Sequence, residues 1–200
     1  MGRILAGFLF LLYLGPVTFG QTSNDRVELF GGYSLVTGDF TGTFGDRNFH
    51  LLNGWEGSAA YKTNRWFGIA ADFSGFYVGY TPPGLGTYEL RARSLSYLFG
   101  PQISLPLPRI TPFAHFLLGA THINYSYGSG CGTGILCAPT SANSFTYAAG
   151  GGVDVTLAKH LALRGQVDLL HSGFSNSDNQ LTYKYHETNA RISTGIVFRF

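Results

Sequence analysis

The chain has 200 residues, of which 12% are charged and 16% aromatic, and its formal net charge at pH 7 is +2. Many aromatic residues with so few charges exclude an intrinsically disordered chain. The small net charge gives no strong field directed at nucleic acid or an anionic membrane surface. The length fits one domain.

The first 20 residues are predicted to be a secretory signal peptide. Arg3 supplies a positive start, residues 4–14 form an apolar stretch, and small residues favour cleavage before Gln21. About eleven apolar residues are too few to span a bilayer comfortably, and no later segment reaches the length of a transmembrane helix. We therefore expect a signal peptide over 1–20 and one domain over 21–200.

Nearly all of that domain alternates between two residue classes with a period of two, which indicates β-strands. Eight strands are expected, near 26–36, 51–62, 67–77, 91–103, 113–125, 144–157, 161–172 and 183–200. Long connections are expected near 38–50, 79–90, 126–143 and 173–183, and short turns near 63–66, 106–110 and 158–160. An even strand count with alternating long and short connections is typical of outer-membrane barrels.

The two faces of these strands differ in side-chain size. One face is rich in Phe, Tyr, Leu, Ile and Val, whereas the other carries mostly Gly, Ala, Ser and Thr with a few charges. An eight-stranded barrel has room inside only for a packed set of side chains, so the bulky face must point outward. Because 12% charged residues cannot cover a soluble barrel, the sequence predicts an all-β, eight-stranded antiparallel up-and-down transmembrane β-barrel.

Several charged residues fall on the inward face. Charges inside a membrane are tolerated only when they avoid lipid and are paired or hydrated. We expect Arg164 and Arg191 to bridge carboxylates across the interior, and the alternative is a gate or solute path. The expected interior charge network comprises Glu28, Glu56, Asp72, Asp154, Arg164, Asp168 and Arg191.

The two cysteines lie in a glycine-rich connection. In an exported chain, Cys131 and Cys137 are expected to form a disulfide that closes a small loop. Two free thiols are the alternative. A metal site is less favoured because the loop holds no other ligand-type residue. The candidates for contact with an extracellular ligand, whose identity stays open, are Tyr125, Tyr127, Ile135 and Leu136.

The last strand alternates up to Phe198 and Phe200. As the ends of a closing strand, these rings fit the aromatic girdle at the periplasmic interface. Such a strand also implies the barrel-assembly machinery as a partner.

The sequence resembles the OmpA-type small outer-membrane β-barrel family. The resemblance rests on the signal peptide, the eight-strand pattern, Leu161-Ala162-Leu163-Arg164 before Val167-Asp168, and the Phe200 ending. It implies a monomer in the lipid of the bacterial outer membrane, without cofactor or nucleic-acid partner. The peptidoglycan-binding domain that some members carry is not expected here.

No catalytic or metal site is predicted. His171 and Ser172 suggest a lipid-modifying site, but adjacent strand residues point to opposite faces and cannot easily pair. The run Gly150-Gly151-Gly152 lies inside a strand, so we expect it to relieve crowding or bend the barrel wall rather than bind phosphate. His115 is expected to be a hydrogen-bonded interior histidine.

The favoured function is a structural, envelope role with surface loops available for binding. The alternatives are adhesion or host and phage binding through those loops, and a narrow pore for small solutes.

Overall fold

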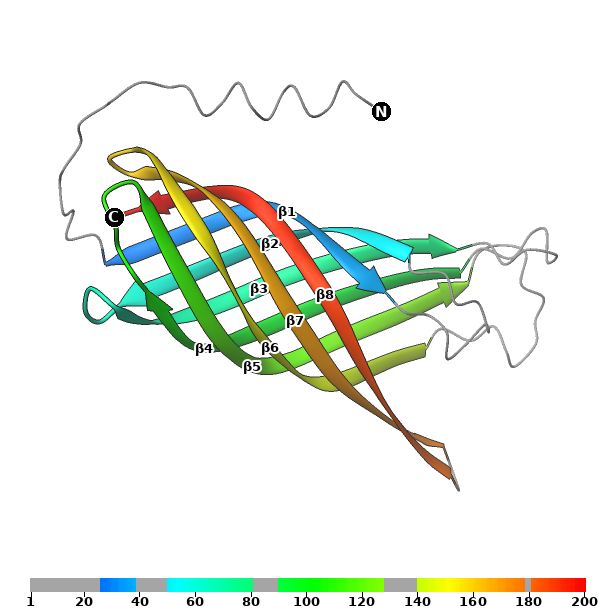
Figure 1. Ribbon diagram of the computed structural model, residues 1–200. Coiled ribbons are helices and arrows are strands. Elements are labelled where there is room, and N and C mark those ends of the chain that lie inside the picture. Colours follow the sequence, from blue (N-terminus) through cyan, green and yellow to red (C-terminus); the bar gives the residue numbers. More distant parts are fainter. Residues whose placement is uncertain (1–25, 39–49, 81–89, 128–139, 179–180) are drawn as a thin grey trace.

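The computed structural model describes residues 26–38, 50–80, 90–127, 140–178 and 181–200, which form a closed barrel of antiparallel strands (Figure 1). Each strand pairs with its neighbours in sequence, and the first pairs with the last. This arrangement confirms the predicted fold class. Within these ranges no helix is long and apolar enough to cross a membrane. The strands are β1 (Val27–Gly38), β2 (His50–Lys62), β3 (Phe67–Tyr80), β4 (Leu90–Ser104), β5 (Ile110–Tyr127), β6 (Thr140–Ala158), β7 (Leu161–Asp178) and β8 (Leu181–Arg199).

The two ends of the barrel differ. The turns 63–66, 105–109 and 159–160 lie at one end, together with the beginning of β1 and the end of β8 (Figure 1). We call this the short-turn end. At the opposite end, three of the four expected long connections fall where the sequence places them, between β1 and β2, β3 and β4, and β5 and β6.

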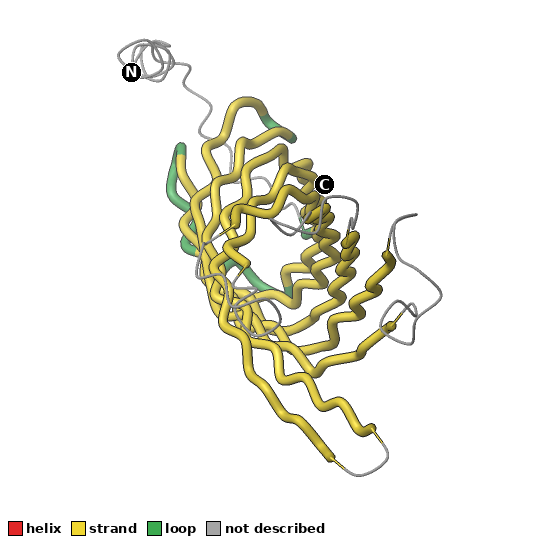
Figure 2. The backbone as a smooth tube through the Cα atoms, turned by 90° about the vertical axis from the view of Figure 1, so that its right-hand side faces the viewer, coloured by secondary structure: helices red, strands yellow, loops and turns green. Residues whose placement is uncertain are grey.

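The expected fourth long loop, near 173–183, is wrong. β7 continues to Asp178 and β8 begins at Leu181, and these two residues pair directly. β6 accompanies β7 only as far as Phe174, and β1 accompanies β8 only as far as Arg191. Residues 175–178 and 181–184 therefore pair only with each other and form a two-stranded ribbon, the β7–β8 ribbon, which extends away from the ring of strands (Figures 1 and 2).

The side chains alternate about the barrel wall as predicted. Phe73 is 52% exposed and Leu169 is 54% exposed, whereas their neighbours Asp72 and Asp168 are 1% and 0% exposed. The same contrast recurs on all eight strands, so the bulky face points outward and the charged face inward.

The interior nevertheless holds more large apolar side chains than the sequence suggested. Small inward residues leave volume that a few large side chains fill to the density of a protein core. The buried apolar residues are Phe30, Val36, Phe76, Leu98, Phe113, Leu117, Leu170 and Val197, with several alanines among them. The expected interior, mostly Gly, Ala, Ser and Thr with a few charges, therefore also contains these large apolar side chains.

The glycine run of β6 faces this crowding directly. Gly150 lies opposite Asp168, and a Cβ at Gly150 would overlap Oδ1 of that carboxylate. A Cβ at Gly152 would likewise collide with Gln166. The prediction that the run relieves crowding is thus confirmed.

Candidate functional site: the interior charge network

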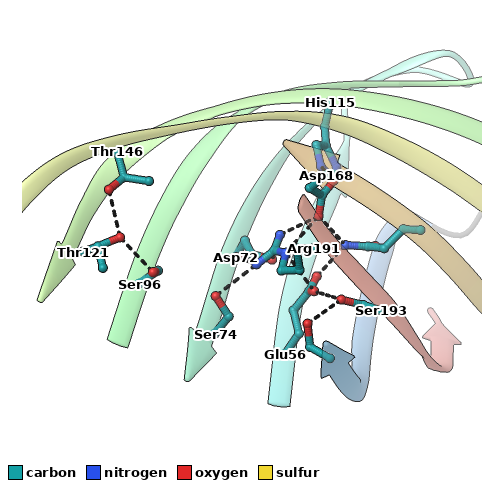
Figure 3. Close-up of polar contacts among 12 residues, drawn as sticks. Glu56, Asp72, Ser74, Ser96, His115, Thr121, Thr146, Asp168, Arg191 and Ser193 are labelled. Carbon is teal, nitrogen blue, oxygen red and sulfur yellow. Dashed lines mark hydrogen bonds and ion pairs between the residues drawn. The ribbon is translucent and has the colours of Figure 1, made fainter. Parts of the chain in front are cut away.

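The most extensive buried polar contacts in the described residues surround Arg191 on β8 (Figure 3). Its Nη1 and Nη2 donate to the two oxygens of Asp72 at 2.9 and 3.2 Å. Its Nε and Nη2 donate to Oδ2 of Asp168 at 3.0 and 2.7 Å. Nε also lies 3.3 Å from Oε2 of Glu56, and Nη1 donates to Ser74 at 3.0 Å. One guanidinium thus joins carboxylates from β2, β3 and β7.

Neutral side chains complete the coordination of these carboxylates. Gln166 Nε2 donates to Glu56 at 2.6 Å and to Asp168 at 3.1 Å. Ser193 donates to the other oxygen of Glu56 at 2.5 Å. Nε2 of His115 lies 2.7 Å from Oδ1 of Asp168, so the expected hydrogen-bonded histidine is present. We call Arg191, Glu56, Asp72, Asp168 and His115 the Arg191 cluster.

A second group of charges lies nearer the short-turn end. Arg164 donates from Nε and Nη2 to the two oxygens of Asp154 at 2.7 and 3.0 Å, a forked geometry that strengthens ion pairs. Arg199 donates to Asp154 at 2.8 Å and to Glu28 at 3.0 Å, and so links these two carboxylates. Lys62 donates to the same Glu28 oxygen at 2.6 Å. We call these five residues the Arg164 cluster.

The Arg164 cluster connects both sides of the barrel seam. Glu28 belongs to β1 and Arg199 to β8, the two strands whose pairing closes the sheet. The guanidinium of Arg164 lies between two aromatic rings, 5.2 Å from the centroid of Phe30 and 4.2 Å from that of Phe113. Such contacts stabilise a cation that has been removed from water.

The two clusters nearly neutralise each other. Four cations face five carboxylates. Buried ion pairs that are fully hydrogen-bonded fix a single register more than they add net stability. Among the described residues, no group of three His, Cys, Asp or Glu side chains could hold a metal ion.

A row of hydroxyl groups runs along the inner wall on the long-connection side of the Arg191 cluster (Figure 3). Ser96 and Thr121 are 2.8 Å apart, Thr146 donates to Thr121 at 2.8 Å, and Ser172 lies 2.9 Å from Thr146. The row ties together β4, β5, β6 and β7. Its members satisfy one another without any charged group.

His171 and Ser172 do not meet. Ser172 belongs to the buried hydroxyl row, whereas the ring of His171 lies outside, 4.9 Å from the ring of Tyr147 and 5.5 Å from that of His186. Nδ1 of His171 lies 2.8 Å from the hydroxyl of Thr188. The two side chains project from opposite faces of β7, as the period of a strand requires.

The structure places all seven of the expected interior charges inside the barrel and within the two clusters. Sequence reasoning did not assign Lys62, Arg199, Gln166 and Ser193 to the network. Lys62 shares its face with Glu56, and Arg199 shares its face with Arg191, so the period of two carried the signal.

The remaining expected site residues lie elsewhere. Phe198 and Phe200 are 50% and 62% exposed at the short-turn end, where Val27 and Phe200 exchange two backbone hydrogen bonds. Tyr125 and Tyr127 are in the last part of β5. Outside the described residues lie the expected signal peptide and Cys131, Ile135, Leu136 and Cys137.

Comparisons with known proteins give one family and several similar structures. Residues 6–199 match the family model described as outer membrane protein beta-barrel domain. Ail, the attachment invasion locus protein of Yersinia pestis, superposes with a TM-score of 0.56 at 14% identity, covering 88% of this chain and 99% of Ail. Neisserial surface protein A gives 0.57 at 12% identity, covering 88% and 96%. A major outer membrane protein of Thermus thermophilus gives 0.52 at 10% identity, covering 86% and 99%. At these identities the likeness concerns the fold alone, and no curated protein matches the chain.

Proposed function

Because the chain belongs to the outer membrane protein β-barrel domain family, we propose that this bacterial outer-membrane protein is a plugged structural barrel. In this proposal it catalyses no reaction and offers its long-connection end for binding. The Arg191 cluster carries the proposal. It crosses the interior from β8 to β2, β3, β5 and β7 with side chains that have almost no exposed surface.

The contacts around Arg191 support a closed interior in two ways. A solute passing along the axis would have to separate the guanidinium from three carboxylates. That separation is costly because it leaves buried charges without their partners. Buried apolar side chains also fill the barrel interior. They include Leu98 and Leu117, which are 2% and 1% exposed. An eight-stranded barrel filled in this way favours a scaffold over the narrow solute pore.

Planar-bilayer recording of the refolded protein tests this proposal. We expect the wild type to show no steady conductance. Substitution Arg191→Ala removes the central crosslink and should produce intermittent current, whereas the exposed-site control Arg93→Ala should stay silent. Steady conductance by the wild type would overturn the plugged barrel in favour of the pore.

An unchanged lipid A mass spectrum on overexpression is the expected result for a protein without lipid-modifying activity.

Binding at the long-connection end is supported by the β7–β8 ribbon. In the ribbon, β7 extends beyond its last pair with β6, and β8 extends beyond its last pair with β1. The ribbon therefore places Ser, Asn and Tyr residues away from the ring of strands (Figure 1). Side chains of these types adapt to many surfaces. Ail has been solved in complex with the heparin analogue sucrose octasulfate, which makes sulfated sugar a first probe.

Two deletions separate structural and binding roles. Removal of residues 128–142 tests the cysteine loop with Ile135 and Leu136, and replacement of residues 176–183 by a two-residue turn tests the ribbon. We expect at least one deletion to abolish attachment to heparin-coated surfaces or host cells. Heat-modifiable gel migration should remain normal in both. Attachment that survives both deletions, or an absence of attachment by the wild type, would remove adhesion from the proposal.

A further inference from the structure

The exposed charged side chains at the short-turn end are all positive among the residues that the structure describes. Arg26 lies just before β1, and each of the three short turns carries one cation: Arg65, Arg109 and Lys159. All four are exposed. The side-chain carboxylates nearest this end among the described residues, Glu28 and Asp154, belong to the buried Arg164 cluster and offer no exposed negative charge.

The net charge of +2 conceals this arrangement. Five of the eleven acidic residues lie inside the barrel, where four cations face them, so they do not offset the exposed cations at the short-turn end. The expectation that no field is directed at an anionic membrane surface is therefore incomplete. It follows from the composition of the whole chain but not from where the fold places each charge.

Hydrogen bonds order the backbone that carries three of the rim cations. The carbonyl of Arg26 accepts from the amide of Lys62 at 2.7 Å, and the carbonyl of Arg109 accepts from Thr156 at 2.9 Å. In the turn that carries Arg65, Oδ1 of Asn64 accepts from two following backbone amides at 2.9 and 2.8 Å. The cations thus project from an ordered ring around the barrel, which lowers the entropic cost of binding a ligand.

Large apolar side chains lie next to these cations on the same turns. Trp66 is 57% exposed, Leu107 is 44% exposed, and Leu157 at the end of β6 is 55% exposed. The guanidinium carbon of Arg65 lies 6.0 Å from the centroid of the Trp66 indole. An exposed apolar residue beside an exposed cation is the pattern of a membrane interface, where the first contacts acyl chains and the second reaches the phosphates.

We propose that this rim, formed by Arg26, Arg65, Arg109 and Lys159, binds the head groups of anionic phospholipids in the periplasmic leaflet. Phosphate oxygens accept hydrogen bonds from the guanidinium and ammonium groups, and the flanking apolar side chains pack against the acyl chains. A water-soluble anionic polymer such as peptidoglycan would use the cations but would leave the apolar side chains unexplained. A lipid uses both.

Spin-label electron paramagnetic resonance tests the proposal on the full chain refolded in phosphatidylcholine bilayers. The measured quantity is the association of spin-labelled phosphatidylglycerol with the protein, relative to spin-labelled phosphatidylcholine. The wild type should prefer phosphatidylglycerol severalfold, and high salt should weaken that preference. The combined variant R26Q/R65Q/R109Q/K159Q should reduce it to parity. The matched control R91Q/R93Q, at the opposite end, should retain it.

Further measurements distinguish the competing explanations. Inorganic phosphate should not displace the spin-labelled lipid, because it lacks the acyl chains. Each single substitution should lower the preference partway toward parity, which keeps the test valid should the combined variant fail heat-modifiable migration. A preference unchanged in the rim variants would overturn the proposal. So would a change confined to peptidoglycan co-sedimentation. Because bilayer conductance reports the interior, these results are independent of the plugged-barrel test.

Discussion

Replacement of Arg191 by methionine would leave Glu56, Asp72 and Asp168 around a neutral side chain in the barrel interior. The guanidinium makes four hydrogen bonds of 2.7–3.2 Å to Asp72 and Asp168, and it is fully buried. Breaking a buried ion pair by removing one partner typically costs about 3–5 kcal/mol. Because three carboxylates lose their shared cation, we expect the free energy of unfolding to fall by an amount at the upper end of that range.

Equilibrium unfolding in urea from lipid vesicles measures this loss. The only two tryptophans, Trp55 and Trp66, are 43% and 57% exposed on the outer face, so their fluorescence reports departure from lipid. Arg191→Lys keeps the positive charge but loses the forked guanidinium, so it should lower the free energy of unfolding by less than Arg191→Met does. Addition of Asp72→Asn to Arg191→Met should recover part of the stability, because one uncompensated carboxylate is removed.

Arg93→Met makes the same chemical change at an exposed outer position and should shift the free energy of unfolding by less than about 0.5 kcal/mol. The reasoning fails if Arg191→Met and Arg93→Met unfold at the same urea concentration. It also fails if Asp72→Asn makes the Arg191→Met variant less stable.

Three further predictions test the facing and closure of the barrel, the first two by the same equilibrium unfolding and the third by the rate of unfolding. Gly150→Ala forces a methyl group into an interior carboxylate and should cost about 1–3 kcal/mol, whereas Gly165→Ala, where a Cβ meets nothing within 4 Å, should cost far less. Leu169→Arg places a charge in the lipid-facing belt and should cost about 2–4 kcal/mol, against about 0–1 for Leu29→Arg nearer the interface; equal costs would contradict the assigned depth. Glu28→Gln removes the anion that links the first and last strands and should speed unfolding, and an unchanged unfolding rate would show that the seam does not depend on this pair.

The outcome at the β7–β8 ribbon shows where hydrophobic patterning loses its power. Residues 175–179 are all polar, so no alternation distinguishes a strand from a loop there. Backbone pairing between Ser175 and Lys184 continues the ladder through this segment. Because that pairing is a property of two segments together, neither segment alone predicts it.

The alternation of residue types determined the eight strands, the closed antiparallel sheet and the face on which each charge lies, because every strand must separate lipid from a narrow interior. Tertiary structure alone decided which charges meet. Arg191 reaches Asp72, 119 residues away, because closure and strand tilt bring β8 and β3 to one level of the barrel. The tertiary structure also decided the cationic rim. No local pattern predicts that the fold buries Glu28 and Asp154 and leaves those four cations exposed at one end.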